Sequence, residues 1–414
     1  MRVIEKRRPV LAVAMANEPD ERRRTFSALV RFVVLFSLLY VALGAAAPFL
    51  PAFLAARGLS PEQIGLLVAL GNVVRLAANP VAGALTDLLQ ARRQVLALCL
   101  AGAAVLAFAL VPAHGFLLLL VLSLLYAAAL APTTTLADAL ALRNAVPDRT
   151  APARFEYGWV RGAGSAAFIV GVLVSGQAVN TFGPAAALAG QGLFLAGALG
   201  AALLVPAPRG PAGRAEGRPA VEVLIRNRPF RRLVLVAAIV LGSHTMHDTF
   251  AMIAWNAAGI SAATGSILWS ASVLAEVVVF FLIGPWLLRR IRPQTAMTIA
   301  VLAAVVRWVV LAQTANVLAL ALVEPLHGLT FALLHLACMR ILVRVTPAAL
   351  AATAQAIYAF GLALTAAVLT LASGFLYAAL GAAGFLAMAV LALAALPAIW
   401  ALRRSLDSAE TPPP

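Results

Sequence analysis

The sequence predicts an all-helical, polytopic membrane protein in which twelve transmembrane helices form two halves of six. Three observations support this class: the composition, the spacing of the apolar segments and the placement of the arginines. Of the 414 residues, 63% are apolar and 11% are charged, whereas about a quarter of the residues of a soluble domain are charged. The mean hydropathy of +0.96 likewise excludes a water-soluble globule of this size.

Twelve apolar segments follow one another along the chain, and each approaches or exceeds the roughly 20 residues that a membrane-spanning helix needs. They cover residues 26–54, 62–86, 94–113, 115–142, 157–180, 184–206, 232–257, 262–288, 294–313, 316–342, 350–375 and 378–402. The residues left over suffice for loops and short tails. A second, soluble domain is therefore excluded.

The connections between these segments alternate between basic and almost uncharged. The chain carries 31 basic and 16 acidic residues, a net charge of +15, and most of its arginines lie in the N-terminal stretch, in alternate connections and in the C-terminal tail. In the other connections Arg57 is the only basic residue. The positive-inside rule then places both termini in the cytoplasm and requires an even number of spans. Basic residues distributed in this way mark membrane topology and do not indicate binding of nucleic acid.

The longest interior break, residues 207–231, is rich in proline, glycine and arginine. It predicts a cytoplasmic linker between an N-terminal six-helix half (26–206) and a C-terminal six-helix half (232–402), with cytoplasmic tails at 1–25 and 403–414. Two such halves are typical of secondary transporters built from repeats, whose substrate site lies between the halves near the middle of the membrane. We expect the chain to reside in the inner (cytoplasmic) membrane of the cell.

Neither a disulfide framework nor a metal site is expected. Cys99 and Cys338 both lie within apolar segments, which excludes a disulfide framework and a thiolate metal cluster. The spacing of His244, His247 and Asp248 imitates a metal site, but these residues lie near the external end of their segment with no further ligand nearby. Lining of a solvated cavity is their expected role.

Ionisable residues within the second-half segments predict a proton-coupling site, because each is costly in lipid and normally faces a cavity or a partner. Glu324 and His327 lie one turn apart in the tenth segment, and at 100° per residue His335 returns to the same face. Glu276 lies near the middle of the eighth segment and Arg307 beyond the middle of the ninth. A cluster of these side chains would take up and release a proton. The alternative is a set of interhelical ion pairs.

The first half carries candidate substrate-binding residues. Asn72 and Arg75 share one face of the second segment. Arg75 lies at mid-membrane, so it requires an anion, either an internal carboxylate or a substrate. Asp138 and Arg161 each lie about one turn inside the cytoplasmic surface. They are expected either to form a structural ion pair or to contact the substrate.

The connection after the second segment reads Gly83-Ala-Leu-Thr-Asp87, followed closely by Arg92. It resembles the loop signature of the major facilitator superfamily, G-x-L-x-D followed by basic residues, although Leu88 and Gln90 depart from that signature. The resemblance implies a conformational latch. Gly83 would let helices approach, and Asp87 would pair at a neighbouring helix end to stabilise one conformer.

Four further segments resemble the phenylpropionate-permease-like branch of this superfamily, which is similar to lactose permease and to nucleoside proton symporters. They are YGWVRGAGSAAF (157–168), WNAAGISAATGSILWSASVLAEVVVFF (255–281), LHGLTFALLH (326–335) and AQAIY (354–358), of which the third is the most specific. Lactose permease also places a carboxylate in span eight, an arginine in span nine and a histidine and a carboxylate one turn apart in span ten. The order of that last pair is reversed here.

We therefore expect a secondary active transporter that works by alternating access as a proton-coupled symporter and imports a small organic solute, with an aromatic carboxylate such as 3-phenylpropionate as the first candidate. Glu324 is the expected proton carrier and Glu276 the second choice. Arg75 or Arg161 would receive the carboxylate, and four aromatic residues would stack on its ring: Trp255, Trp269, Phe331 and Tyr358. The energy source would be the proton gradient without a cofactor, and the partners would be the solute, protons and the lipid bilayer, with the chain a monomer.

Other functions are compatible with the same fold. A proton-antiport exporter of lipophilic compounds and a nucleoside or sugar proton symporter are the main alternatives. An enzyme embedded in the membrane would need a dedicated catalytic constellation, which the sequence does not contain. A scaffold or sensor would not need ionisable residues in such costly positions.

Overall fold

The computed structural model describes residues 8–145, 155–206 and 221–410, and the regular structure in these ranges is helical. The first part of the predicted linker, residues 207–220, lies outside the described residues, as do the outermost parts of the two predicted tails. The helices of the first half are α1 (Arg8–Ala46), α2 (Leu50–Ala56), α3 (Pro61–Leu89), α4 (Arg92–Leu110), α5 (Phe116–Ala145), α6 (Tyr157–Phe182) and α7 (Ala185–Leu204).

The helices of the second half are shorter and more often interrupted. They are α8 (Val221–Arg226), α9 (Arg228–Gly242), α10 (Thr245–Ala257), α11 (Ala262–Val278), the π-helical η1 (Val279–Ile283), α12 (Gly284–Leu288), α13 (Pro293–Gln313), α14 (Val317–Val323), the 3-10 turn η2 (Glu324–Leu326), the π-helical η3 (Gly328–Leu333), α15 (Leu334–Val345), η4 (Ala348–Leu350), α16 (Ala351–Leu380), η5 (Gly381–Gly384), α17 (Phe385–Leu393) and α18 (Leu396–Glu410).

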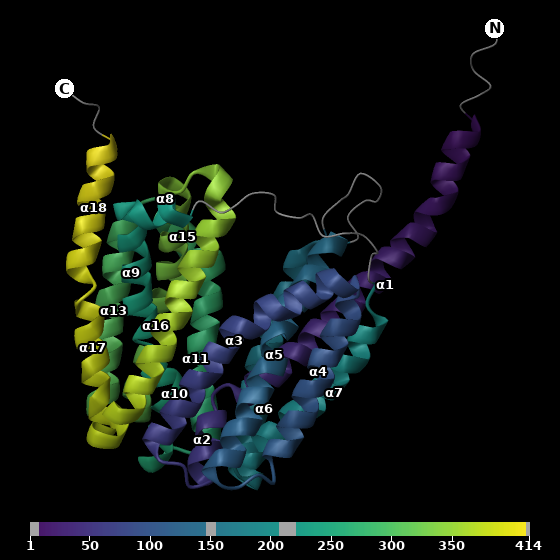
Figure 1. The fold of residues 1–414 in the computed structure, drawn as a ribbon. Coiled ribbons are helices and arrows are strands. Elements are labelled where there is room, and N and C mark those ends of the chain that lie inside the picture. The colour runs from purple at the N-terminus through teal and green to yellow at the C-terminus, as the bar shows by residue number, and fades with distance from the viewer. Residues whose placement is uncertain (1–7, 146–154, 207–220, 411–414) are drawn as a thin grey trace.

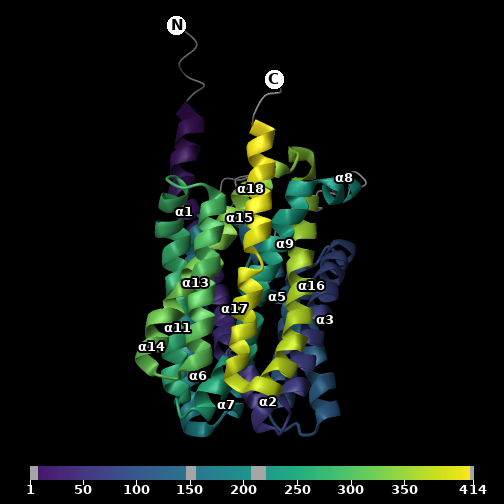
Figure 2. The ribbon, with the colours of Figure 1, turned by 90° about the vertical axis from the view of Figure 1, so that its left-hand side faces the viewer.

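Within the described ranges, eleven stretches are long and apolar enough to cross a membrane, and the last of them, Thr353–Asp407, has 55 residues. That stretch makes two passes, because α16 and the α17–α18 pair run in opposite directions on either side of η5, with α9 packed against both (Figure 2). The described residues thus make twelve membrane passes in two halves of six, as the apolar segments predicted.

Local signals in the sequence set the helix boundaries. Ser60 and Gln63 form a reciprocal capping box at the start of α3, with Pro61 at its first position, where the missing N–H of proline costs nothing. The helix ends at Gln90, whose φ of 50° is left-handed, as is common just after a helix. Pro325 interrupts a helix, whereas Pro61 begins one. Its missing N–H breaks the tenth pass between α14 and η3.

The two halves diverge toward the end of the molecule that carries α8, the start of α1 and the end of α18, which we call the terminal end (Figure 1). They converge at the opposite end, the α2 end, where α3 packs on α16 and α6 on α11. A cavity of about 1540 Å³ lies between them, lined by residues of α1, α3 and α5 from the first half and α10 and α16 from the second.

Two backbone approaches close the α2 end. A Cβ atom added to Gly65 would lie 2.8 Å from the Cα of Gly374, and one added to Gly176 would overlap the side chain of Ser266. Glycine is required at these positions because a real Cβ atom needs about 3.5 Å or more from another carbon. The small residues therefore let helices of opposite halves touch.

Candidate functional site

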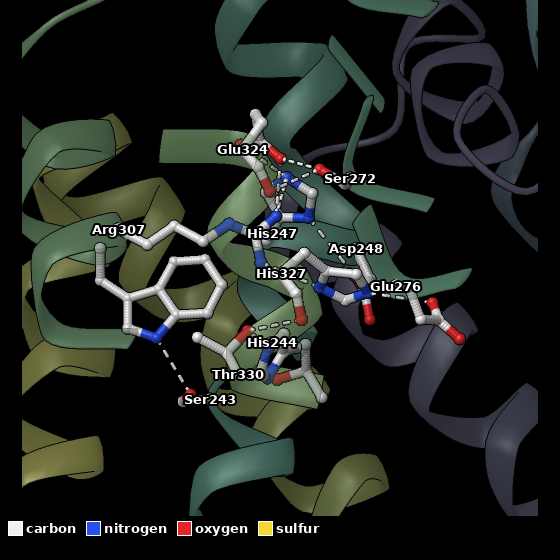
Figure 3. A network of polar contacts seen from close by, with 12 residues as sticks. Ser243, His244, His247, Asp248, Ser272, Glu276, Arg307, Glu324, His327 and Thr330 are labelled. Carbon is white, nitrogen blue, oxygen red and sulfur yellow. Dashed lines mark hydrogen bonds and ion pairs between the residues drawn. The ribbon is translucent and has the colours of Figure 1, made fainter. Parts of the chain in front are cut away.

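Arg307 is the centre of a buried polar cluster in the second half (Figure 3). Its guanidinium is fully buried on α13 and donates to Oε2 of Glu324 at 2.6 Å. It also lies 3.1 Å from Nδ1 of His327 and 3.2 Å from Nε2 of His247. One arginine thus joins a carboxylate and two imidazoles from three different elements: η2, the η2–η3 junction and α10.

Glu324 is fully buried at the helix break that precedes Pro325. The hydroxyl of Ser272 donates to its Oε2 at 2.5 Å and also to its backbone oxygen at 3.0 Å. Its other oxygen, Oε1, faces Nε2 of His247 at 3.3 Å. A buried carboxylate is tolerated only with such partners, because transfer of an isolated charge out of water is very costly.

Each imidazole also contacts a carboxylate other than Glu324. Nδ1 of His247 lies 3.4 Å from Oδ1 of Asp248, and Nε2 of His327 lies 3.4 Å from Oε2 of Glu276. The cluster therefore extends from the buried Arg307–Glu324 pair in two directions and ends at two partly exposed carboxylates.

Aromatic rings surround this cluster. The imidazole of His247 stacks on Trp269 with ring centroids 4.9 Å apart and contacts Trp255 edge-on at 5.8 Å. The ring of Phe331 stacks on His327 at 5.4 Å. These three aromatics were expected to bind the substrate, and the structure places them around the imidazoles. They do not belong to the lining of the cavity, so a contact with substrate stays a prediction.

Two further residues of the tenth and eleventh passes make no hydrogen bond or ion pair with the cluster in the described ranges, although His335 lies within electrostatic range of Glu276. The ring of His335 packs edge-on against Phe280 at 5.8 Å, although the sequence placed it on the face of Glu324. The π-helical turn η3 lies between the two residues and widens the helix there, which changes the angle at which His335 projects. Tyr358 is buried in the apolar core of the second half and does not line the cavity.

The cavity wall of the first half carries Arg75, with Asn72 and Asn79 on the same helix. In the described ranges the Arg75 guanidinium makes no hydrogen bond or ion pair. The Tyr126 hydroxyl lies close enough to Arg75 for an electrostatic interaction. The hydroxyl of Tyr126 donates to Oε1 of Gln191 at 2.6 Å. Arg75 thus faces the cavity with no carboxylate partner among the described residues.

The predicted alternative of an Asp138–Arg161 ion pair is wrong. Asp138 accepts a hydrogen bond of 2.7 Å from the Tyr157 hydroxyl, and the Arg161 guanidinium lies over the ring of Tyr40, 4.7 Å from its centroid. Tyr157 begins α6 one turn before Arg161, and it is the Tyr157 hydroxyl that occupies the Asp138 carboxylate. The Nη1 atom of Arg161 is buried with no hydrogen-bond partner among the described residues.

The latch region is only partly as expected. Oδ1 of Asp87 lies 3.6 Å from Nη2 of Arg92 at the start of α4, so the carboxylate does lie at a neighbouring helix end. A Cβ atom added to Gly83 would meet nothing within 4 Å. The prediction that Gly83 permits a close helix approach is therefore wrong in this conformation.

The sequence missed His247, Asp248 and Ser272 as members of the cluster, because it assigned His247 and Asp248 to the lining of a solvated cavity. The sequence signal for Asp248 was its adjacency to a buried histidine, whereas no signal pointed to Ser272. His244 is also closer to the site than expected, because its Nε2 lies 2.8 Å from the hydroxyl of Thr330 on the tenth pass. In the described part of the chain, no group of three or more histidine, cysteine or acidic side chains could hold a metal ion.

Twelve passes in two halves around a central cavity, with ionisable side chains buried at mid-depth, define a secondary active transporter of the membrane. The chain belongs to the MFS_1 like family, whose model matches residues 29–387. Its relatives are transporters and not enzymes.

Among these relatives is the probable 3-phenylpropionic acid transporter of Escherichia coli (strain K12), which is 34% identical over 358 residues, covering 84% of this chain and 91% of the relative. The solved structure of the nucleoside transporter NupG superposes with a TM-score of 0.78 at 17% identity and covers 91% of this chain and 98% of its own. A bacterial homologue of the human lysosomal transporter Spinster superposes with a TM-score of 0.73 at 14% identity and covers 95% and 99%. These two structures establish the shared fold.

Proposed function

We propose that this protein is a proton-coupled symporter of the inner membrane that imports a small aromatic carboxylate related to 3-phenylpropionate. The observation that carries the proposal is the buried Arg307–Glu324 pair, held between two imidazoles. The 34% identity to a probable 3-phenylpropionic acid transporter supports the substrate class. The chain would act as a monomer, with the proton gradient as its energy source and no cofactor.

The orientation rests on the arginines. Because basic residues concentrate at the terminal end, both termini and α8 are assigned to the cytoplasm. The α2 end, which Gly65 and Gly374 hold closed, would then face the outside. In this conformation the cavity would open toward the cytoplasm, which is the state that releases an imported solute.

The Arg307–Glu324 pair suits coupling because its two stable states differ by one proton. The carboxylate is either ionised and paired with the guanidinium, or protonated and neutral, since an unpaired charge in this dry site is too costly. Substrate binding and the switch in access would each favour one of these states and would thereby link solute movement to proton movement.

The cavity suits an amphipathic anion. Arg75 has no anionic partner in the described ranges and would receive a carboxylate by a charge-assisted bond. Apolar residues such as Leu67 and Phe360 line the same cavity and would contact a ring. Arg161, whose Nη1 lacks a partner, is the second candidate for the carboxylate.

Transport in proteoliposomes tests the proposal. Labelled 3-phenylpropionate should accumulate when the inside is made alkaline, and Glu324→Gln should abolish this accumulation while exchange of labelled for unlabelled substrate continues. The amide imitates the protonated carboxylate and cannot release a proton. Accumulation by Glu324→Gln against the substrate gradient would exclude Glu324 as the carrier. Proton antiport of the same probe would favour an exporter.

A further inference from the structure

Glu324 needs a route by which its proton reaches water, because its own side chain is fully buried. We infer that Asp248 and His247 form this route, and that Asp248 is the group through which the cluster exchanges protons with the central cavity. The inference rests on the proposed proton coupling and names the residues that supply the proton.

Exposure rises step by step along this route. The side chain of Glu324 is 0% exposed and that of His247 is 4% exposed, whereas that of Asp248 is 57% exposed. Asp248 lines the cavity, together with Thr245 and Thr249 of the same helix. The two steps measure 3.3 Å from Glu324 Oε1 to His247 Nε2 and 3.4 Å from His247 Nδ1 to Asp248 Oδ1. An imidazole with both nitrogens facing carboxylates is suited to pass a proton between them.

The position of the His247 ring fits both protonation states of Glu324. Its Nε2 lies 3.2 Å from Nη2 of Arg307 and 3.3 Å from Oε1 of Glu324. When Glu324 is protonated, Nε2 is bare and accepts from Arg307, while Nδ1–H donates to Asp248. When Glu324 is ionised, Nε2 carries a proton and donates to Oε1.

Proton release follows from these two states. The Oε1 proton of Glu324 passes to Nε2 of His247, the Nδ1 proton of the resulting imidazolium passes to Asp248, and Asp248 releases it to water in the cavity. Glu324 and Asp248 end ionised and His247 ends neutral, with its proton on Nε2. Proton uptake runs the same steps backward and returns the imidazole proton to Nδ1, so the relay resets without a separate step.

The second branch of the cluster does not offer an equivalent route. Nδ1 of His327 faces the guanidinium of Arg307 at 3.1 Å and Nε2 faces Glu276. An arginine keeps its proton throughout, so a proton that enters at Glu276 stops at His327. Glu276 is also outside the cavity lining. This branch holds the Arg307 guanidinium in place, and protons reach Glu324 through His247.

Several other charged groups surround Asp248 and tune its exchange. His244 and His247 on its own helix, His327 from the tenth pass and Glu276 from α11 lie within electrostatic range, and Arg75 of α3 lines the same cavity. Only His247 of this set has contacts with both Asp248 and Glu324 in the described structure.

The test compares Asp248→Asn with wild-type protein in proteoliposomes, with labelled 3-phenylpropionate as the probe. Asparagine keeps the size and the hydrogen bond but carries no proton, so uptake driven by an imposed pH gradient should slow by at least about a hundredfold, the lower end of the usual contribution of a proton-transfer group. Exchange at equal pH requires no net proton movement and should continue. Asp248→Glu should restore most of the driven uptake. Asp407→Asn makes the same chemical change at a half-exposed carboxylate of α18 outside the cavity lining and serves as the control.

The outcomes separate the two proposals. If wild-type protein does not accumulate the probe, both the proposed function and the relay are refuted. If wild-type protein accumulates the probe, Glu324→Gln does not, and Asp248→Asn does so at the wild-type rate, the relay alone is refuted. Loss of exchange as well as driven uptake in Asp248→Asn, without rescue by Asp248→Glu, would assign Asp248 to substrate binding and would also overturn the relay.

Discussion

The contact between Gly65 of α3 and Gly374 of α16 predicts that bulk at Gly65 will open the α2 end. A Cβ atom at Gly65 would lie 2.8 Å from the Cα of Gly374 and 3.1 Å from both its nitrogen and the Thr370 carbonyl oxygen. Because carbon atoms normally stay about 3.5–4.0 Å apart, the two helices must separate by about 1 Å for alanine and by more for valine. The neighbours are backbone atoms, which have no rotamer to change.

The strain exists only while the two halves touch at the α2 end, so it acts on the equilibrium between access states. Overpacking of a tight contact costs about 1–3 kcal/mol. In Gly65→Val this cost should raise the ratio of molecules open at the α2 end to those closed there by about 5- to 150-fold.

Spin-label distances measure this shift. Labels at Phe182 and Leu380, which are exposed near the α2 end, should move apart, and labels at Leu88 and Val343, exposed toward the terminal end, should approach each other. The matched control is Gly83→Val on the same helix, because a Cβ atom there meets nothing within 4 Å. Cys99 and Cys338 are replaced in every variant. Wild-type distances in Gly65→Val, or an equal change in Gly83→Val, would refute the reasoning.

Two further predictions concern the first half. Asp87→Asn removes the charge that faces Arg92 and should slow interconversion of the access states while substrate affinity stays near wild type; an equal loss of affinity in a binding titration would instead assign Asp87 to the site. Arg75→Gln should weaken binding of 3-phenylpropionate by about 10- to 150-fold, since a hydrogen bond to a charged group contributes about 1.5–3 kcal/mol. The uncharged 3-phenylpropionamide should bind both proteins alike, and unchanged affinity for the acid in Arg75→Gln would transfer the carboxylate to Arg161.

Much of the fold could be predicted from the sequence because membrane passes follow from local composition. A lipid-embedded backbone must satisfy its own hydrogen bonds, so a long apolar segment becomes a helix whatever it packs against. The depth of a residue follows from the rise of 1.5 Å per residue. Counting along the passes was therefore enough to place Glu276, Arg307 and Glu324 at similar depth, and the structure brings Arg307 and Glu324 into contact.

The tertiary structure decided which side chains meet at a given depth. Helix neighbours and rotation about each axis are set by packing between distant segments, which a single sequence does not encode locally. Asp138 contacts Tyr157 and not Arg161, and Asp248 joins the cluster through His247, which follows the break between α9 and α10 and faces Glu324.

Irregular turns explain the remaining differences. The sequence placed His335 on the face of Glu324 by assuming 100° per residue, but the 3-10 turn η2 and the π-helical turn η3 lie between them. Each such turn changes the rotation per residue. The direction of His335 about the helix axis, summed over eleven residues from Glu324, therefore cannot be predicted, whereas its depth in the membrane changes little. The sequence by itself thus determined the passes, their number and the depth of the charged residues. Only the tertiary structure decided their partners, because contacts between helices depend on rotation and packing that no single helix specifies.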